Sequence, residues 1–238
     1  MLANNPNEFH SGRLDQDVHL PSTAKLELVD FIGRELPRWR DNTDRPRREA
    51  ETALTEQLCD HLNSATYYSV NWSHIQFRTE TCDETHPGRR IDLTVKPRAA
   101  VLIIEGRRHS QFYAIFPIEC KRLPTPNDSR RDEREYVITE SGTTGGIQRF
   151  KFGYHGAVHK FAAMIAYVQE QTFSHWLHQV NHWIQELSLE SNSQWIDADS
   201  LSLLNDDSLA GICVLTSSHT RSENLDTCQL RHIWIRMN

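Results

Sequence analysis

The sequence predicts a mixed α/β domain with a central mixed β-sheet flanked by helices, and changes in hydrophobic periodicity carry this prediction. Up to residue 65, apolar residues recur every three to four positions, as they do along one face of an amphipathic helix. From residue 73 the period is two, which is typical of strands. Helical spacing returns after residue 146, and two strand-like segments close the chain. A sheet covered by helices would bury the apolar side of each of these elements.

Two helices are expected before the strands. Residues 24–37 carry apolar side chains at helical spacing, and we expect this helix to end before Pro37, because proline disfavours a helical conformation at the preceding residue. Residues 45–65 are a clearer helix, because three leucines recur every four positions. These are Leu54, Leu58 and Leu62.

The first 22 residues are polar and aperiodic, so we expect them to form an irregular arm. This divides the chain into an N-terminal arm with a short helix, residues 1–44, and one folded domain, residues 45–238. A chain of 238 residues is long enough for such a domain to bury a substantial core.

The remaining elements follow from the same patterns. Strand-like segments are found at 73–80, 89–97, 101–105 and 112–123. The polar segment 124–146 is long enough to cover a substrate or to dock a partner. We then expect helices at 147–170 and 173–187, the first with an irregular start around Gly153–Gly156 and an apolar FAAMIAYV core that would pack on a sheet. The last two strands are expected at 211–218 and 229–237.

Bulk composition excludes several classes of protein. No apolar run approaches the ~20 residues that span a bilayer, and the N-terminus lacks the basic and apolar regions of a secretory signal. We therefore expect a cytoplasmic protein with no membrane segment. The five cysteines are scattered, odd in number and form no CxxC pair, which argues against a disulfide framework or a zinc ribbon.

The net charge of −6 is unusual for a protein that binds DNA on its own, because such proteins are more often basic. The arginines are nevertheless clustered, and four clusters precede residue 132. They comprise Arg45, Arg47 and Arg48, then Arg89 and Arg90, Arg107 and Arg108, and Arg130 and Arg131. A local basic groove, or a partner subunit that supplies most of the affinity, would reconcile this pattern with the acidic net charge.

Two strand-like segments carry the residues that indicate chemistry. Alternate side chains of a strand share a face, so Asp92 lies on the polar face of 89–97, opposite an apolar face. In 112–123, Glu119 and Lys121 share a face at the end of a strand that is otherwise apolar on both sides. Charged groups emerging from such a strand need partners or water, because their burial alone would cost several kcal/mol.

If these two strands are neighbours, Asp92 and Glu119 can point into one cleft. Two adjacent carboxylates repel unless a proton or a cation lies between them. Mg²⁺ is the natural candidate because it prefers oxygen ligands, and Mn²⁺ could substitute; the backbone carbonyl of Cys120 could add a ligand. Lys121 would then lie where it can orient an attacking water or stabilise charge on a phosphate.

An acid, any residue and a lysine is a weak motif in general. Lysine is rare here, with five lysines against 21 arginines, and Glu-x-Lys occurs once, after an Asp-bearing strand. The context therefore makes Lys121 more informative than the motif alone.

These residues resemble the PD-(D/E)xK nuclease superfamily, whose fold is that of restriction endonucleases, over roughly residues 45–170. The resemblance implies Mg²⁺-dependent hydrolysis of phosphodiester bonds in DNA, with in-line attack that expels the 3′ oxygen. It assigns Asp92 and Glu119 as metal ligands and Lys121 as the catalytic lysine. The proline that precedes the first acid in the family is absent, and Arg90-Ile91 stands there.

The resemblance also extends to two helices. Glu51 resembles the acid of the family's first helix, a third metal ligand, and it lies on the stripe that Leu54 defines. Gln148 resembles the polar residue that many members place on a later helix near the site, although it could equally cap that helix. A compact nuclease domain with an acidic surface is similar to nuclease subunits of bacterial antiviral defence or restriction-type complexes.

Two other functions remain open at this point. The nuclease fold could be retained without turnover, as a binding or structural subunit of a larger protein complex, or the substrate could be RNA. The sequence leaves the oligomeric state open, a homo-oligomer included.

Overall fold

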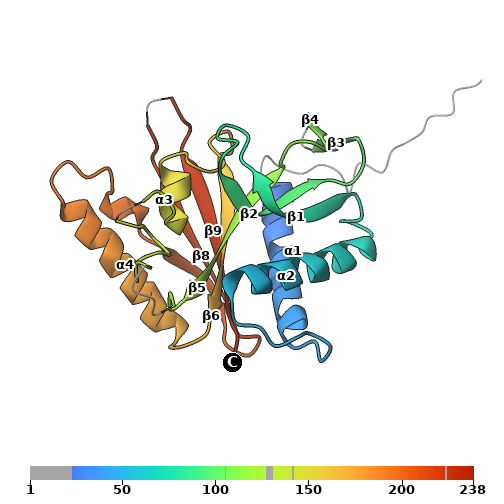
Figure 1. The fold of residues 1–238 in the computed structure, drawn as a ribbon, viewed down its shortest axis with the longest axis horizontal. Coiled ribbons are helices and arrows are strands. Elements are labelled where there is room, and N and C mark those ends of the chain that lie inside the picture. The colour runs from blue at the N-terminus through green and yellow to red at the C-terminus, as the bar shows by residue number, and fades with distance from the viewer. Residues whose placement is uncertain (1–22, 105, 127–130, 141, 223) are drawn as a thin grey trace, which may run out of the picture.

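The computed structural model describes residues 23–104, 106–126, 131–140, 142–222 and 224–238. The expected N-terminal arm, residues 1–22, lies outside this part. Among the described residues, seven strands form one mixed sheet between two layers of helices (Figure 1). The predicted α/β class, with a central mixed sheet flanked by helices, is therefore confirmed. No helix in the described ranges is both long and apolar enough to cross a membrane.

The strand order places the two chemistry-bearing segments side by side. Across the sheet the strands are β1 (Ile75–Cys82), β2 (Arg90–Pro97), β5 (Phe116–Leu123), β6 (Phe161–Val168), β9 (Cys228–Arg236), β8 (Ile212–His219) and β7 (Ser202–Asp207). β5, β6 and β9 run parallel, and the other neighbours are antiparallel. A separate hairpin pairs β3 (Val101–Ile104) with β4 (Arg107–Ser110).

Helices cover both faces of the sheet (Figure 1). α1 (Thr23–Arg40) and α2 (Glu51–Tyr67) pack on one face, where their leucines join side chains of β1, β2 and β5 in one apolar core. α3 (Gly146–Lys151) and α4 (Phe173–Leu189) cover the other face and form a second core with β6, β8 and β9. A 3-10 turn, η1 (Asp197–Asp199), follows α4.

The helix predicted over 147–170 is wrong beyond its first turn. α3 ends at Lys151, and the apolar FAAMIAYV run forms the central strand β6, in which every residue is buried. A strand in the middle of a sheet that is covered on both faces is apolar throughout, so it has no alternation to distinguish it from a buried helix. Parallel neighbours on both sides complete its hydrogen bonding.

The first two helices also differ from the prediction at their ends. α1 continues through Pro37 to Arg40, because buried Leu36 and Trp39 hold its last turn against the core. α2 begins at Glu51 rather than at residue 45. The sequence pattern also missed β4 and the exposed edge strand β7, neither of which has an apolar face of its own.

Candidate active site

The candidate site lies where β2 and β5 separate. Their ladder pairs Leu93 with Ile118 but is not continued at Asp92 and Glu119, the next positions in that register. The Asp92 side chain takes over the pairing there, since its Oδ2 accepts the backbone N–H of Cys120 at 2.8 Å. Where the two strands separate, one carboxylate lies on each side of the gap. This is the arrangement expected if the strands that carry Asp92 and Glu119 are neighbours.

Strand alternation in β5 separates the polar site from the core. Glu119 and Lys121 lie on the face of α3, and both are almost fully buried. Cys120 points to the opposite face, where its thiol lies beside Thr55 and Tyr167 in the first core. The thiol thus belongs to the first core, while the Cys120 carbonyl lies on the same strand edge as its N–H, which Asp92 accepts.

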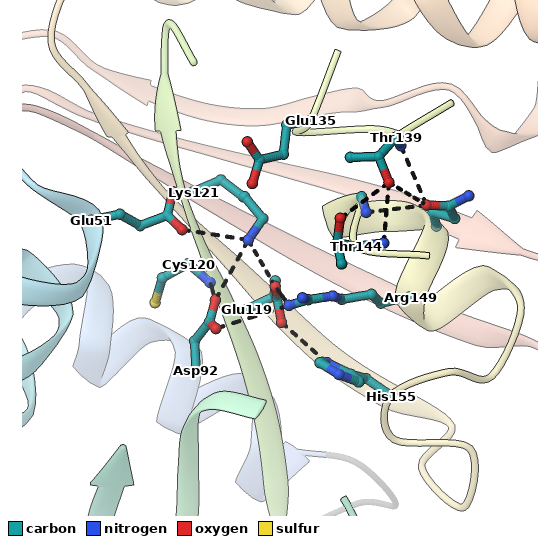
Figure 2. A network of polar contacts seen from close by, with 12 residues as sticks. Glu51, Asp92, Glu119, Cys120, Lys121, Glu135, Thr139, Thr144, Arg149 and His155 are labelled. Atoms are coloured by element: carbon teal, nitrogen blue, oxygen red, sulfur yellow. Dashed lines mark hydrogen bonds and ion pairs between the residues drawn. The ribbon is translucent and has the colours of Figure 1, made fainter. Parts of the chain in front are cut away.

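Lys121 is the centre of the cluster (Figure 2). Its Nζ donates to Glu119 Oε1 at 2.9 Å, and it lies 3.8 Å from Asp92 Oδ2 and 3.5 Å from Glu51 Oε1. Burial alone would lower the pKa of this ammonium, but the three carboxylates outweigh burial and raise the pKa of Lys121 above its ordinary value. The lysine therefore remains charged and serves as a shared counter-ion.

Glu51 reaches the cluster because it is the first residue of α2. Its Oε2 accepts the backbone N–H of Arg122 at 3.1 Å, which fixes the start of the helix against the edge of β5. The acid therefore stands at the N-terminus of α2 and beside Lys121. The structure thus brings together all four of the residues Glu51, Asp92, Glu119 and Lys121.

Two residues that the sequence analysis did not assign to the site also contact Glu119. Arg149 of α3 donates from Nη1 to Glu119 Oε1 and lies 3.9 Å from Asp92 Oδ1. The Nδ1 atom of His155, in the turn after α3, lies 3.2 Å from Glu119 Oε2. Both oxygens of Glu119 are therefore contacted by nitrogen atoms.

The two strand carboxylates differ in how well their charge is compensated. Burial would raise the pKa of Glu119, but Lys121, Arg149 and His155 hold it below its usual range. Burial, followed by repulsion from Glu119, raises the pKa of Asp92 to about 8, and the nearby cations offset this only in part. Asp92 is thus the group of this cluster that an additional cation would stabilise most.

Gln148 does not reach the carboxylates. Its Oε1 accepts the N–H groups of Gly145 (3.1 Å) and Thr139 (3.3 Å), and its Nε2 donates to the carbonyl of Gly142. The side chain caps α3 and holds the preceding loop in place. Gln148 thus takes the capping role that the sequence analysis gave as the alternative to a role in the site. It is a neighbour of the site through Arg149, one residue further along the helix.

A cleft of about 370 Å³ opens onto the cluster from the side of β2 and α3. Asp92, Arg149 and His155 line it, and Arg89 and Arg90 add two further guanidinium groups. The Arg89 guanidinium stacks on the Tyr154 ring, 4.3 Å from its centroid, and its Nη1 is buried with no hydrogen-bond acceptor among the described residues. The lining of the cleft therefore combines the carboxyl group of Asp92 with donors suited to an anion.

The donor chemistry of the cluster suits a hard divalent cation. Asp92, Glu119 and the Cys120 carbonyl present oxygen atoms, and Asp92 lacks full charge compensation. Across the described residues, no three histidine, cysteine, aspartate or glutamate side chains are arranged to hold a metal ion. Nitrogen atoms of Lys121 and Arg149 contact Glu119 and lie within 3.9 Å of Asp92.

Comparisons of this chain with protein-family profiles, curated proteins and solved structures gave no match. The interpretation of the site consequently rests on its own geometry.

Proposed function

We propose that this protein is a metal-dependent nuclease of the PD-(D/E)xK type that hydrolyses phosphodiester bonds of DNA. The observation that carries the proposal is the contact of one buried lysine with carboxylates from three elements, at the point where two strands separate below a cleft that contains arginines. A purely structural salt bridge would not need three acids, and burying so many charges is costly unless they serve a further purpose.

Asp92, Glu119 and the Cys120 carbonyl would hold a divalent cation, Mg²⁺ or Mn²⁺, with Glu51 on the far side of Lys121 as a further acid. When bound there, the cation would neutralise charge that develops on the attacked phosphate. Lys121, held by its carboxylate partners, would orient the attacking water and donate to the phosphate. Arg89, which lines the cleft, would donate to a phosphate oxygen there.

The acidic net charge of −6 supports a role as one subunit of a larger cytoplasmic assembly, such as a defence or restriction-type complex, in which a partner supplies part of the DNA affinity. A second candidate function is that of a binding subunit without turnover. The position of Lys121 and Arg149 between the carboxylates favours this candidate, since a cation must compete with both side chains for the same oxygens.

The test is cleavage of plasmid DNA with Mg²⁺ by the wild type, Lys121→Ala and Asp92→Ala. Both variants should lose at least roughly 10²-fold in rate, because each removes a group that acts on the developing charge. Lys160→Ala is the matched control, since Lys160 pairs with Asp226 at the surface and should leave the rate unchanged.

Cleavage that survives in both variants would contradict the proposed site. A wild type that binds DNA but never cleaves it, even with partner proteins added, would favour the binding subunit. The same assay on single-stranded and duplex RNA identifies an RNA-directed enzyme.

A further inference from the structure

Arg149 occupies the gap between the two strand carboxylates. Its Nη1 contacts Glu119 Oε1 and lies 3.9 Å from Asp92 Oδ1, so one guanidinium nitrogen faces both acids (Figure 2). Lys121 Nζ approaches the same two carboxylates. It lies 2.9 Å from Glu119 Oε1, which Arg149 also contacts, and 3.8 Å from Asp92 Oδ2, the other oxygen of that carboxylate. Arg149 therefore stands where a cation shared by Asp92 and Glu119 would stand.

The charges of the cluster are consistent with an exchange of cations. With all three carboxylates ionised, as metal binding requires, Glu51, Asp92 and Glu119 face the two cations Lys121 and Arg149, and one negative charge remains in excess when His155 is left out of the count. Without Arg149 the excess is two, which one divalent cation balances. Lys121 could not be exchanged in the same way, because it also holds Glu51.

Arg149 has space into which it can move. Its side chain is 15% exposed and lines the cleft together with Arg89 and Arg90. Its helix is anchored independently, because Lys151 forms a buried ion pair with Asp199 at 2.8 Å and Gln148 caps the first turn. A change of side-chain rotamer would thus carry the guanidinium into the cleft while α3 stays in place.

We infer that Arg149 is a resident counter-ion which the divalent cation displaces, and that its guanidinium then binds a phosphate of the nucleic-acid substrate. The inference rests on the proposed function. Arg149 holds the carboxylates together when no metal is bound, and it becomes a catalytic residue once the metal has taken its place. A planar guanidinium is suited to both partners, since it matches carboxylate and phosphate geometry alike. Metal binding and substrate binding are thereby coupled through one side chain.

This exchange predicts effects of opposite sign in one variant. Arg149→Met keeps the length of the side chain but removes the competing charge, so MnCl₂ alone should bind at least about tenfold more tightly than to the wild type by calorimetry. DNA cleavage at saturating Mn²⁺ should fall about 10²-fold, because the phosphate loses a charged donor. Arg149→Gln should behave similarly, which provides a second protein if the methionine variant folds poorly.

Arg90→Met is the matched control, because Arg90 lines the same cleft but donates to the Glu80 carbonyl. It should leave Mn²⁺ affinity within about twofold of the wild type. Thermal unfolding gives an independent readout: Mn²⁺ should raise the melting temperature of Arg149→Met more than that of the wild type.

Mn²⁺ affinity that is unchanged or weaker in both Arg149 variants, with binding intact in the wild type, would overturn the displacement while leaving the proposed nuclease unaffected. Failure of every protein to bind Mn²⁺ would overturn the displacement and the metal-dependent function together. Tighter Mn²⁺ binding without any loss of cleavage would overturn the phosphate-binding step.

Discussion

Asp92 is the acid of the candidate site whose ionised form is least compensated by nearby cations. Burial and the adjacent Glu119 raise its pKa to about 8, whereas the ordinary pKa of an aspartate is 3.8. The folded protein therefore binds more protons at this position than the unfolded chain at any pH between these two values. The free energy of unfolding must then decrease as the pH rises through this interval.

The prediction is that the metal-free wild type loses stability between pH 6.5 and 8, by at most roughly 1.4 kcal/mol per pH unit from this residue. Asp92→Asn should remove most of this slope, because the amide does not titrate. Urea denaturation in EDTA at several pH values measures the free energy of unfolding of both proteins, and hence its slope with pH. Equal slopes in the two proteins would show that Asp92 is ionised well below pH 8 in the folded state.

The sequence predicted the residues whose placement depends on strand alternation alone. Asp92, Glu119 and Lys121 lie on one face of adjacent strands, and Glu51 follows the buried stripe of its helix. Arg149 was missed because its position depends on how the 124–146 segment turns into α3, which no periodic pattern encodes. The resemblance had favoured the adjacent Gln148, and neighbouring residues of a helix point about 100° apart.

His155 was missed for a related reason. The helix predicted over 147–170 would have included it, whereas the chain turns at Gly153 and Gly156, both of which have a positive φ angle. These turns send the imidazole of His155 back toward Glu119. The two glycines had indicated an irregular stretch within the predicted helix, but they mark the region where the helix has ended.

At the scale of elements, α3 is short and depends on its contacts with the rest of the fold. It has six residues, which is too few for a helix to be stable on its own. One side carries Arg149 toward the carboxylates, and Lys151 on another side is buried against Asp199 of η1. Asp199 also accepts from His219 Nδ1 at 2.8 Å, so β8, η1 and α3 meet at one carboxylate.

We predict that Asp199→Asn lowers the free energy of unfolding by about 3–5 kcal/mol, because it leaves the Lys151 ammonium buried without a counter-charge. Asp226→Asn is the control, since its pair with Lys160 is exposed and is worth about 0–1 kcal/mol. Chemical denaturation measures both. A loss below about 1 kcal/mol for Asp199→Asn would show that Lys151 can find water or another acceptor.

The main error in the predicted fold is the helix expected where the chain forms β6, and the position of β6 in the sheet explains it. β6 is covered by α1 and α2 on one side and by α4 on the other, so its sequence carries no period that distinguishes strand from helix. The apolar run has eight residues, which is a typical strand length. Its length therefore indicated a strand better than its periodicity did. Strands with one polar face, such as β2, were predicted correctly within two residues.

For the whole molecule, net charge is a poor guide to where an anion binds. The chain carries −6 overall, yet the cleft above the site is lined by Arg89, Arg90 and Arg149. Screening by salt reduces the long-range repulsion between the acidic surface and DNA, while short-range phosphate contacts persist. The observable quantity is therefore the salt dependence of binding and not the net charge.

Arg89 provides the decisive measurement, because it lines the cleft and its buried Nη1 has no hydrogen-bond acceptor among the described residues. If it contacts a phosphate, Arg89→Met should weaken binding of a DNA duplex in EDTA at all sequences and reduce the slope of log K against log salt by about one. Arg38→Met is the control, since Arg38 lies on α1, across the sheet from α3, and is 69% exposed. Fluorescence anisotropy at several salt concentrations gives both slopes. An unchanged slope in Arg89→Met, with binding otherwise intact, would place the DNA outside this cleft and separate the nucleic-acid path from the carboxylate cluster.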